Sequence, residues 1–120
     1  MRAFPGRDQI GFLQGLTLTS FGVGPYQIDL FFDGGTILNV EHRLTYVDEQ
    51  GTHSTYDVQG AIAPLAFHSL VRDQAIIEDI CIEDTKLTLL FSKGRKLIVE
   101  TDIGPYEAGH ISHNGEIFVF

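Results

Sequence analysis

The sequence predicts a mainly β fold with a minor helical part: a curved antiparallel sheet that is half-barrel or barrel-like. Two observations predict this fold. Apolar and polar residues alternate with the period of half-buried strands, and the same pattern occurs twice along the chain. We therefore expect one domain of 120 residues, with two repeated three-strand meanders at about 15–58 and 74–120 and a connecting helix at about 63–71.

The two copies are offset by 59 residues, so that FFDGGTILNVE at 31–41 aligns with LFSKGRKLIVE at 90–100. Each copy reads as a hairpin with a three-residue loop, 33–35 or 92–94, that ends in glycine. Such loops need a left-handed residue at that position, which glycine adopts without strain. The register then places Leu30 opposite Leu38 and Leu89 opposite Leu97, and the apolar faces of the paired strands coincide.

The strand before each hairpin changes its side-chain phase once. We expect a β-bulge near Thr19-Ser20 and another near Glu78-Asp79, because one extra residue shifts the alternation in this way. The return strand of the first hairpin alternates without a break from 38 to 46, which places His42 on its inner face. Bent strands of this kind favour a strongly curved sheet.

The remaining segments predict three further elements. Residues 46–47 and 53–58 flank the polar stretch 48–52 and indicate a hairpin, and Asn114-Gly115 is a two-residue turn signal before an apolar terminal strand. The Ala- and Leu-rich segment after Pro64 predicts the short helix. Its core-facing side chains should be Leu65, Phe67, Leu70 and Val71.

The net charge of −8 and the pI near 4.8 favour cations and basic proteins as partners. Residues 1–60 and 61–120 each carry −4, so the acidity is expected to be spread over the fold. A negative field repels phosphate, so nucleic acid and anionic membranes are not expected as direct partners. The segment 1–7 does not resemble a signal peptide, and we expect a cytoplasmic protein.

No pattern in the sequence indicates catalysis, a cofactor or a metal. His110 and His113 are three residues apart after Glu107, but in a strand such positions face opposite ways. The acidic pairs 48–49 and 83–84 lack calcium-loop spacing. Cys81, the single cysteine, has no neighbouring base, and its apolar flanks predict a buried and inert strand residue.

The candidate partner-binding residues lie on the outer face of the predicted hairpins. They are Asp29, Glu41, Glu100, Phe31 and Ile37. Apolar residues on this face, with Leu90 and Ile98 in the second copy, indicate that it is covered by the helix, by a packed second sheet or by a partner.

The second copy resembles a group of small uncharacterised bacterial proteins associated with polymorphic-toxin immunity loci. The resemblance lies in the strand–glycine hairpin–strand of 87–99, the PYE segment at 105–107 and the terminal NGEIFVF at 114–120. It covers about half of the chain and implies the fold and a binding role, with no catalytic residue to carry over. The sequence departs from the pattern at Ala108-Gly109, where the group commonly has an aromatic residue.

The leading hypothesis is therefore a non-catalytic, immunity-type inhibitor that binds a basic toxin domain. One alternative is a small-molecule-binding β domain with a pocket lined by Tyr26, His42 and Tyr46; a structural or interaction protein is another. A third is a minimal hydrolase that uses His42. The sequence leaves the partner, the strand order between the copies and a homodimer open.

Overall fold

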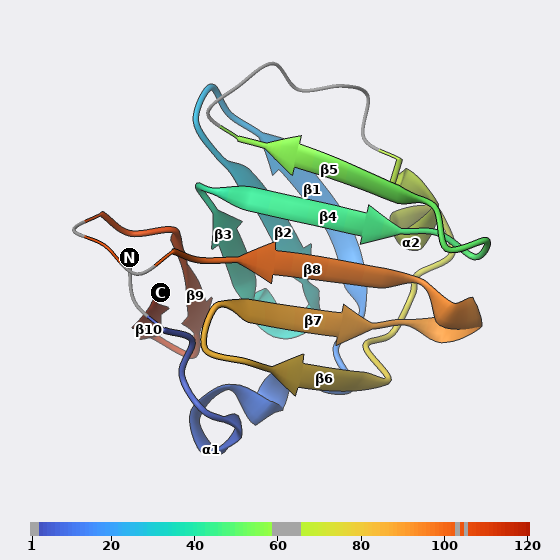
Figure 1. Cartoon of the computed structure of the whole chain (residues 1–120). Coiled ribbons are helices and arrows are strands. Elements are labelled where there is room, and N and C mark those ends of the chain that lie inside the picture. The colour runs from blue at the N-terminus through green and yellow to red at the C-terminus, as the bar shows by residue number, and fades with distance from the viewer. Residues whose placement is uncertain (1–2, 59–65, 103, 105) are drawn as a thin grey trace.

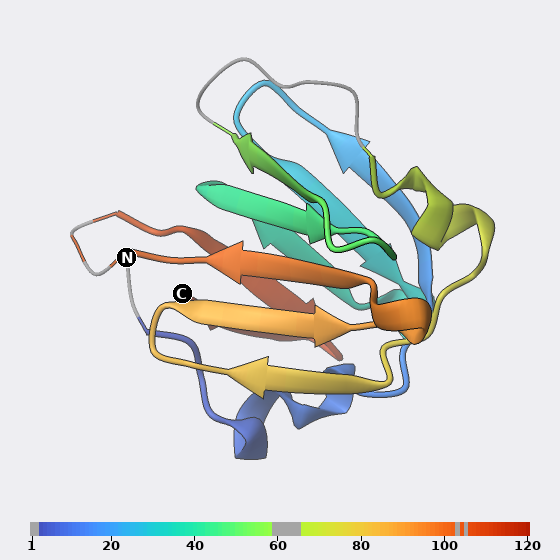
Figure 2. The same ribbon diagram turned by 45° about the vertical axis from the view of Figure 1, so that its right-hand side comes forward.

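The strands predicted from the alternating pattern form two antiparallel sheets of five strands, which face each other in the computed structural model (Figure 1). Residues 3–58, 66–102, 104 and 106–120 are described. The prediction of a mainly β fold is confirmed. The two sheets do not close into a barrel, and the strands of one cross those of the other (Figures 1 and 2).

The first sheet has the order β1-β2-β3-β9-β10 and the second the order β5-β4-β8-β7-β6. The strands of the first sheet are β1 (Leu18–Val23), β2 (Ile28–Phe32), β3 (Ile37–Val40), β9 (Gly109–His113) and β10 (Glu116–Val119). Those of the second are β4 (Arg43–Val47), β5 (His53–Asp57), β6 (Asp79–Ile82), β7 (Lys86–Leu90) and β8 (Lys96–Glu100).

Both repeated hairpins have the predicted register. Leu30 lies opposite Leu38 in the pair β2–β3, and Leu89 lies opposite Leu97 in the pair β7–β8. The two loops form the short 3₁₀ turns η2 (Asp33–Gly35) and η3 (Ser92–Gly94), and both end in a glycine with positive φ. The hairpins β4–β5 and β9–β10, the second with Asn114 and Gly115 both at positive φ, are also confirmed.

The structure agrees with both expected bulges. The register between β1 and β2 shifts between Leu18 and Ser20, as predicted. In the second copy, Asp79 pairs with Leu90, and the Glu78 N–H also donates to the Leu90 carbonyl, so that two residues face one near Glu78-Asp79. Just before this point, the chain pairs with the segment before β1 through an isolated bridge from Thr17 to Ile76.

The return strand expected to continue from 38 to 46 is broken at Glu41 and His42. Val40 ends β3 in the first sheet and Arg43 begins β4 in the second. At the crossing, the Glu41 N–H donates to the Ala108 carbonyl, and the His42 carbonyl accepts from the Val58 N–H. The alternation runs through the crossing without a break, which is why the sequence pattern does not reveal it.

Each copy gives three strands to one sheet and two to the other. Strands β1–β3 are completed by β9–β10, and β6–β8 are completed by β4–β5. Equivalent residues also meet. Thr17 pairs with Ile76, 59 positions later, and the Leu18 N–H donates to the Ala75 carbonyl while the Ile77 N–H donates to the Leu16 carbonyl. The two copies are therefore related by an approximate two-fold axis through this bridge.

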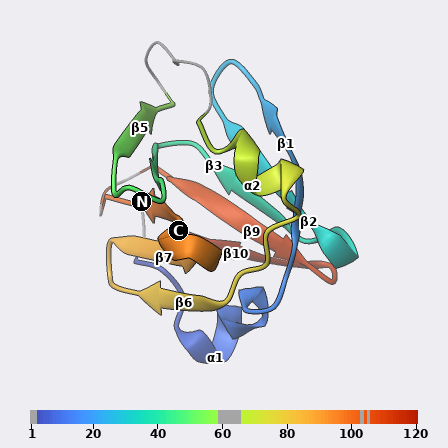
Figure 3. The ribbon, with the colours of Figure 1, turned by 90° about the vertical axis from the view of Figure 1, so that its right-hand side faces the viewer.

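Helical segments close the two open sides between the sheets (Figure 3). Phe67, just before α2 (His68–Arg72), packs against Phe21 of β1 and Tyr56 of β5. On the opposite side, Phe12 in η1 (Gly11–Leu13), which follows α1 (Arg7–Ile10), packs against Phe118 of β10. Sequence analysis did not predict α1.

The connecting helix is shorter than predicted. Residues 63–65 of the expected segment 63–71, including Leu65, lie outside the described residues, and α2 begins at His68. Phe67 and Leu70 are fully buried as expected, and Val71 is partly buried against the core. No helix among the described residues is long and apolar enough to cross a membrane.

The core fills the space between the inner faces of the sheets. Fully buried Leu and Ile side chains from both sheets dominate it, and each contributes about 1.5–3 kcal/mol by leaving water. The terminal Phe120 is fully buried and packs on Phe4, so the apolar C-terminus belongs to the core. The prediction that Cys81 is buried is wrong: the thiol is exposed, because Cys81 alternates with the buried Ile80 and points away from the core.

Candidate interaction surface

The outer face of the first sheet carries two parallel rows of residues, and neither helix lies on this face of the ribbon (Figure 3). We call these ten residues the Asn39 face. One row, in strand order, is Gly22, Asp29, Asn39, His110 and Val119. The other row is Ser20, Phe31, Ile37, Ser112 and Ile117. Of the three covers that the sequence left open, the helix and the second sheet do not cover this face, and a partner stays a prediction.

A hydrogen-bonded carboxylate and amide occupy the centre of the Asn39 face. Asn39 Nδ2 donates to Asp29 Oδ1 at 2.8 Å, and Gln27 Nε2 donates to Asp29 Oδ2 at 2.9 Å. These two donors fix the carboxylate. Asn39 is only 4% exposed, although it lies on the outer face of the sheet, and its Oδ1 is buried without a hydrogen-bond partner. A buried carbonyl without a donor costs about 1–3 kcal/mol.

Apolar side chains surround this polar centre. Ile117, on the edge strand β10, is 65% exposed, and Phe31, Ile37 and Val119 are partly exposed. The Phe31 ring lies over Gly22, where a Cβ would meet ring carbon Cε2 at 3.5 Å. Apolar residues that gather on an exposed sheet face are typical of a protein interaction surface.

Acidic residues without balancing cations are found in the segments that contain the strands of the first sheet. Segments 8–42 and 101–120 contain seven acidic residues and no Lys or Arg, whereas the rest of the chain contains nine acidic and eight basic residues. The strands of the second sheet carry three acidic residues and also Arg43, Lys86 and Lys96. The even charge of the two halves of the sequence therefore does not make the two sheets alike, and the expectation of evenly spread acidity is corrected.

The repeat supplies an internal comparison for this face. By their place in the fold, the positions of Asp29, Asn39 and His110 correspond to Thr88, Ile98 and Thr45 in the second sheet. Both rows have the same strand positions and the same pairing. Because the second sheet forms without a carboxylate, an amide or an imidazole there, the architecture does not require them at the centre of the first.

The structure brings together three of the five predicted partner-binding residues. Asp29, Phe31 and Ile37 lie on the Asn39 face, as expected. Glu41 follows the end of β3, at the crossing between the sheets.

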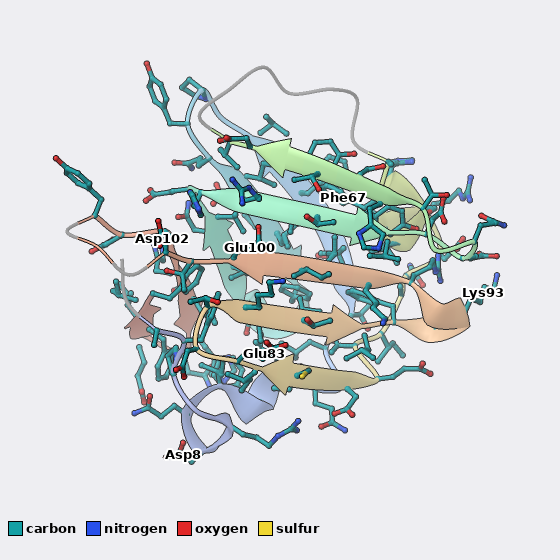
Figure 4. All side chains as sticks on the ribbon, in the orientation of Figure 1. Asp8, Phe67, Glu83, Lys93, Glu100 and Asp102 are labelled. Atoms are coloured by element: carbon teal, nitrogen blue, oxygen red, sulfur yellow. The ribbon has the colours of Figure 1, made fainter. Side chains whose placement is uncertain are left out.

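Glu100 lies elsewhere, on the outer face of the second sheet (Figure 4). It pairs there with Arg43 at 3.3 Å and with Lys86 at 3.9 Å. These two cations offset its charge, so Glu100 does not belong to the Asn39 face.

The remaining chemical candidates are dispersed. His110 lies on the Asn39 face, while His113 faces the other way, stacks on Phe12 at 3.7 Å and shares a hydrogen bond of 2.6 Å between its Nδ1 and Thr36 Oγ1. His42 is partly buried at the crossing between β3 and β4. Within the described ranges, no three His, Cys, Asp or Glu side chains gather as a metal site would require.

The two tyrosines predicted to line a small-molecule pocket do not share one: one is exposed and the other is buried in the core. Tyr26 is 67% exposed in the turn before β2, whereas Tyr46 is 3% exposed in the core and shares a hydrogen bond with Ser69. A surface depression of about 450 Å³ lies instead beside the β9–β10 hairpin, where Phe12, His113 and Phe118 line it together with Asp8 and Glu116.

Four members of the surface were not predicted from the sequence: Asn39, His110, Ile117 and Val119. The signal for Asn39 was its alignment with Ile98 in the repeat, a polar residue where the other copy has an apolar one. The β9 and β10 residues could not be placed, because their position depends on the exchange of hairpins between the copies.

Comparison with models of protein families, with curated proteins and with solved structures gives no significant match to this chain.

Proposed function

We propose that this protein is a non-catalytic, immunity-type inhibitor that binds a basic toxin domain with its Asn39 face. The observation that carries the proposal is the combination on this face of exposed apolar side chains and a sheet whose strands contain no Lys or Arg. The resemblance of the second copy to proteins of toxin-immunity loci agrees with this role.

Each part of the surface has a distinct task in binding. The negative field of segments 8–42 and 101–120 speeds the encounter with a basic domain, and salt weakens this effect. After contact, Phe31, Ile37 and Ile117 become buried against the partner. Their burial stabilises the complex, as that of large apolar side chains does at the centre of interfaces. Binding on such a face needs no catalytic group.

The test uses the protein encoded beside this chain in its genome, with its toxic domain purified and also co-expressed. We expect this chain to restore growth and to bind the domain, with an association rate that falls as salt rises. Ile117→Arg and Asp29→Lys should each weaken binding by about tenfold or more, since each places a positive charge against a basic partner.

The matched controls make the same changes elsewhere. Ile76→Arg replaces another exposed isoleucine, 51% exposed, and Glu78→Lys replaces an exposed acid outside the first sheet. We expect both controls to bind like the unmodified protein. The proposal is overturned if the neighbouring protein is not inhibited, or if the two pairs of variants behave alike.

A further inference from the structure

We propose that Asp29 and Asn39 form a subsite that accepts one arginine side chain of the partner. The inference rests on the proposed function, because it names the residue type by which a basic domain would be recognised. It also applies to the free protein, which makes it testable without the partner.

Asp29 is a positioned carboxylate without a cation among the described residues. Its two oxygens accept hydrogen bonds from Asn39 Nδ2 at 2.8 Å and Gln27 Nε2 at 2.9 Å, and the side chain stays partly exposed. No ion pair to Asp29 forms within the described part of the chain. Each oxygen retains a second lone pair, as the planar two-donor fork of a guanidinium requires.

Asn39, beside Asp29, has a buried oxygen that lacks a hydrogen-bond donor. The side chain is 96% buried, since its exposed fraction is 4%, and Oδ1 has no donor, although Nδ2 of the same amide is well bonded. A guanidinium has five N–H donors and can serve Asp29 and this oxygen together. The oxygen is covered in the free protein, so a donor reaches it once a neighbouring side chain moves. The partly exposed His110 lies opposite Asn39 on β9, and exposed side chains change rotamer within picoseconds to nanoseconds.

The fold does not require the polar pair of Asp29 and Asn39. The equivalent positions in the second sheet hold Thr88 and Ile98, with the same register and the same flanking strands. Polar groups that a fold does not need, and that leave one acceptor unsatisfied, are expected where a ligand supplies the missing donor.

An aromatic side chain lies beside this polar pair. Phe31 is the next residue of β2 on the same face, and a Cβ on Gly22, the residue opposite Asp29, would be 3.5 Å from its ring carbon Cε2. A guanidinium bound to Asp29 can lie against this ring, which adds a cation–π contact that favours arginine over lysine. The subsite therefore combines a fixed carboxylate, an unpaired acceptor and an aromatic wall.

The experiment titrates the ¹⁵N-labelled full chain with three blocked tripeptides, acetyl-Gly-X-Gly-amide, in which X is arginine, lysine or citrulline. Citrulline keeps the shape of arginine and removes its charge. At an ionic strength of about 0.01 M, where screening extends over about 30 Å, we expect the arginine peptide to shift the Asn39 side-chain amide signals saturably in the millimolar range. The lysine peptide should bind at least about fivefold more weakly, and the citrulline peptide not measurably.

Two variants test the assignment. Asp29→Thr with Asn39→Ile installs the residues of the second sheet and should abolish the saturable shifts, which are then followed on the backbone amide of Phe31. Asp29→Asn removes only the charge and should weaken binding by about tenfold, so the test does not depend on the double variant remaining folded. The control Thr88→Val alters the equivalent position of the other sheet and should leave binding unchanged.

Equal shifts with the arginine and lysine peptides, shifts that persist in Asp29→Asn, or no saturable shift would each overturn the subsite. These outcomes are separate from the fate of the proposed function. If the toxin is inhibited through the Asn39 face but the peptides do not bind, the arginine subsite alone is wrong. If the arginine peptide binds as described but no toxin is inhibited, the proposed function alone is wrong.

Discussion

Replacing Asp29 by Thr and Asn39 by Ile should make the protein more stable. In the unmodified chain, the buried Oδ1 of Asn39 has no donor, which costs about 1–3 kcal/mol. The substitution removes this cost. It also removes both members of the Asn39–Asp29 hydrogen bond, so neither partner is left unsatisfied, and it installs the Thr and Ile that the second sheet accommodates at the equivalent positions. Isoleucine also suits a strand better than asparagine, within a scale of about 1 kcal/mol.

The net expectation is a gain of about 1–3 kcal/mol in the free energy of unfolding. Urea unfolding followed by circular dichroism measures it, and the midpoint should rise by about 1 M at an unchanged slope, given slopes of about 1–3 kcal/mol per M for small domains. The reciprocal change, Thr88→Asp with Ile98→Asn, should lower the midpoint, because it introduces the polar pair into the second sheet.

A lower midpoint for the Asp29→Thr, Asn39→Ile variant would refute the reasoning. It would mean that the polar pair stabilises the first sheet, and that the internal comparison with the second sheet does not hold. A gain in stability combined with loss of arginine binding is the trade-off expected of a functional site.

Three further predictions follow from other contacts. Gly109→Ala should lower the melting temperature by about 10 °C or more, or prevent folding, since a Cβ there would overlap the Asn39 carbonyl oxygen; differential scanning calorimetry checks this. The Arg95 guanidinium donates to Asp73 and holds the pKa of that carboxyl below its ordinary value of 3.8. This contribution to the free energy of unfolding is therefore complete above pH 3.8 and is lost as the pH falls further. Arg95→Met should make the free energy of unfolding depend less on pH in this acid range, and an unchanged pH dependence would contradict the reasoning. The exposed thiol of Cys81 should react fully with a thiol reagent in the native state, whereas slow reaction limited by unfolding would contradict its placement.

The hairpins were predictable because the interactions that define them are local. Loop length, the terminal glycine and the coincidence of apolar faces fixed the register of Leu30 with Leu38 without knowledge of any other strand. The turn at Asn114-Gly115 was predictable for the same reason.

The arrangement of the sheets was not predictable from such signals. The alternation continues from β3 into β4, so the sequence does not show that the chain leaves one sheet at Glu41 and enters the other at Arg43. The prediction for Cys81 was wrong because its apolar flanks suggested burial, although alternation along the strand puts Cys81 on the face opposite to that of the buried Ile80.

The residues of the candidate site also differ in whether a local sequence pattern places them. Asp29, Phe31 and Ile37 were predicted because they alternate with the core residues of a single hairpin. His110 and Ile117 belong to a hairpin more than 70 residues away along the chain from those three, and their place beside Asn39 depends on pairing across the copies. Non-local pairing of this kind leaves no periodic signal.

The exchange of hairpins between the copies bears on how the chain folds during synthesis. The ribosome makes β1–β5 first, but β3 then lacks its neighbour β9, and β4 lacks β8. Neither half can finish a sheet by itself, so we expect nascent chains that end before β8 to stay sensitive to protease. Protection should arise in a single step once β10 has emerged from the exit tunnel, and the released protein should unfold as one cooperative unit.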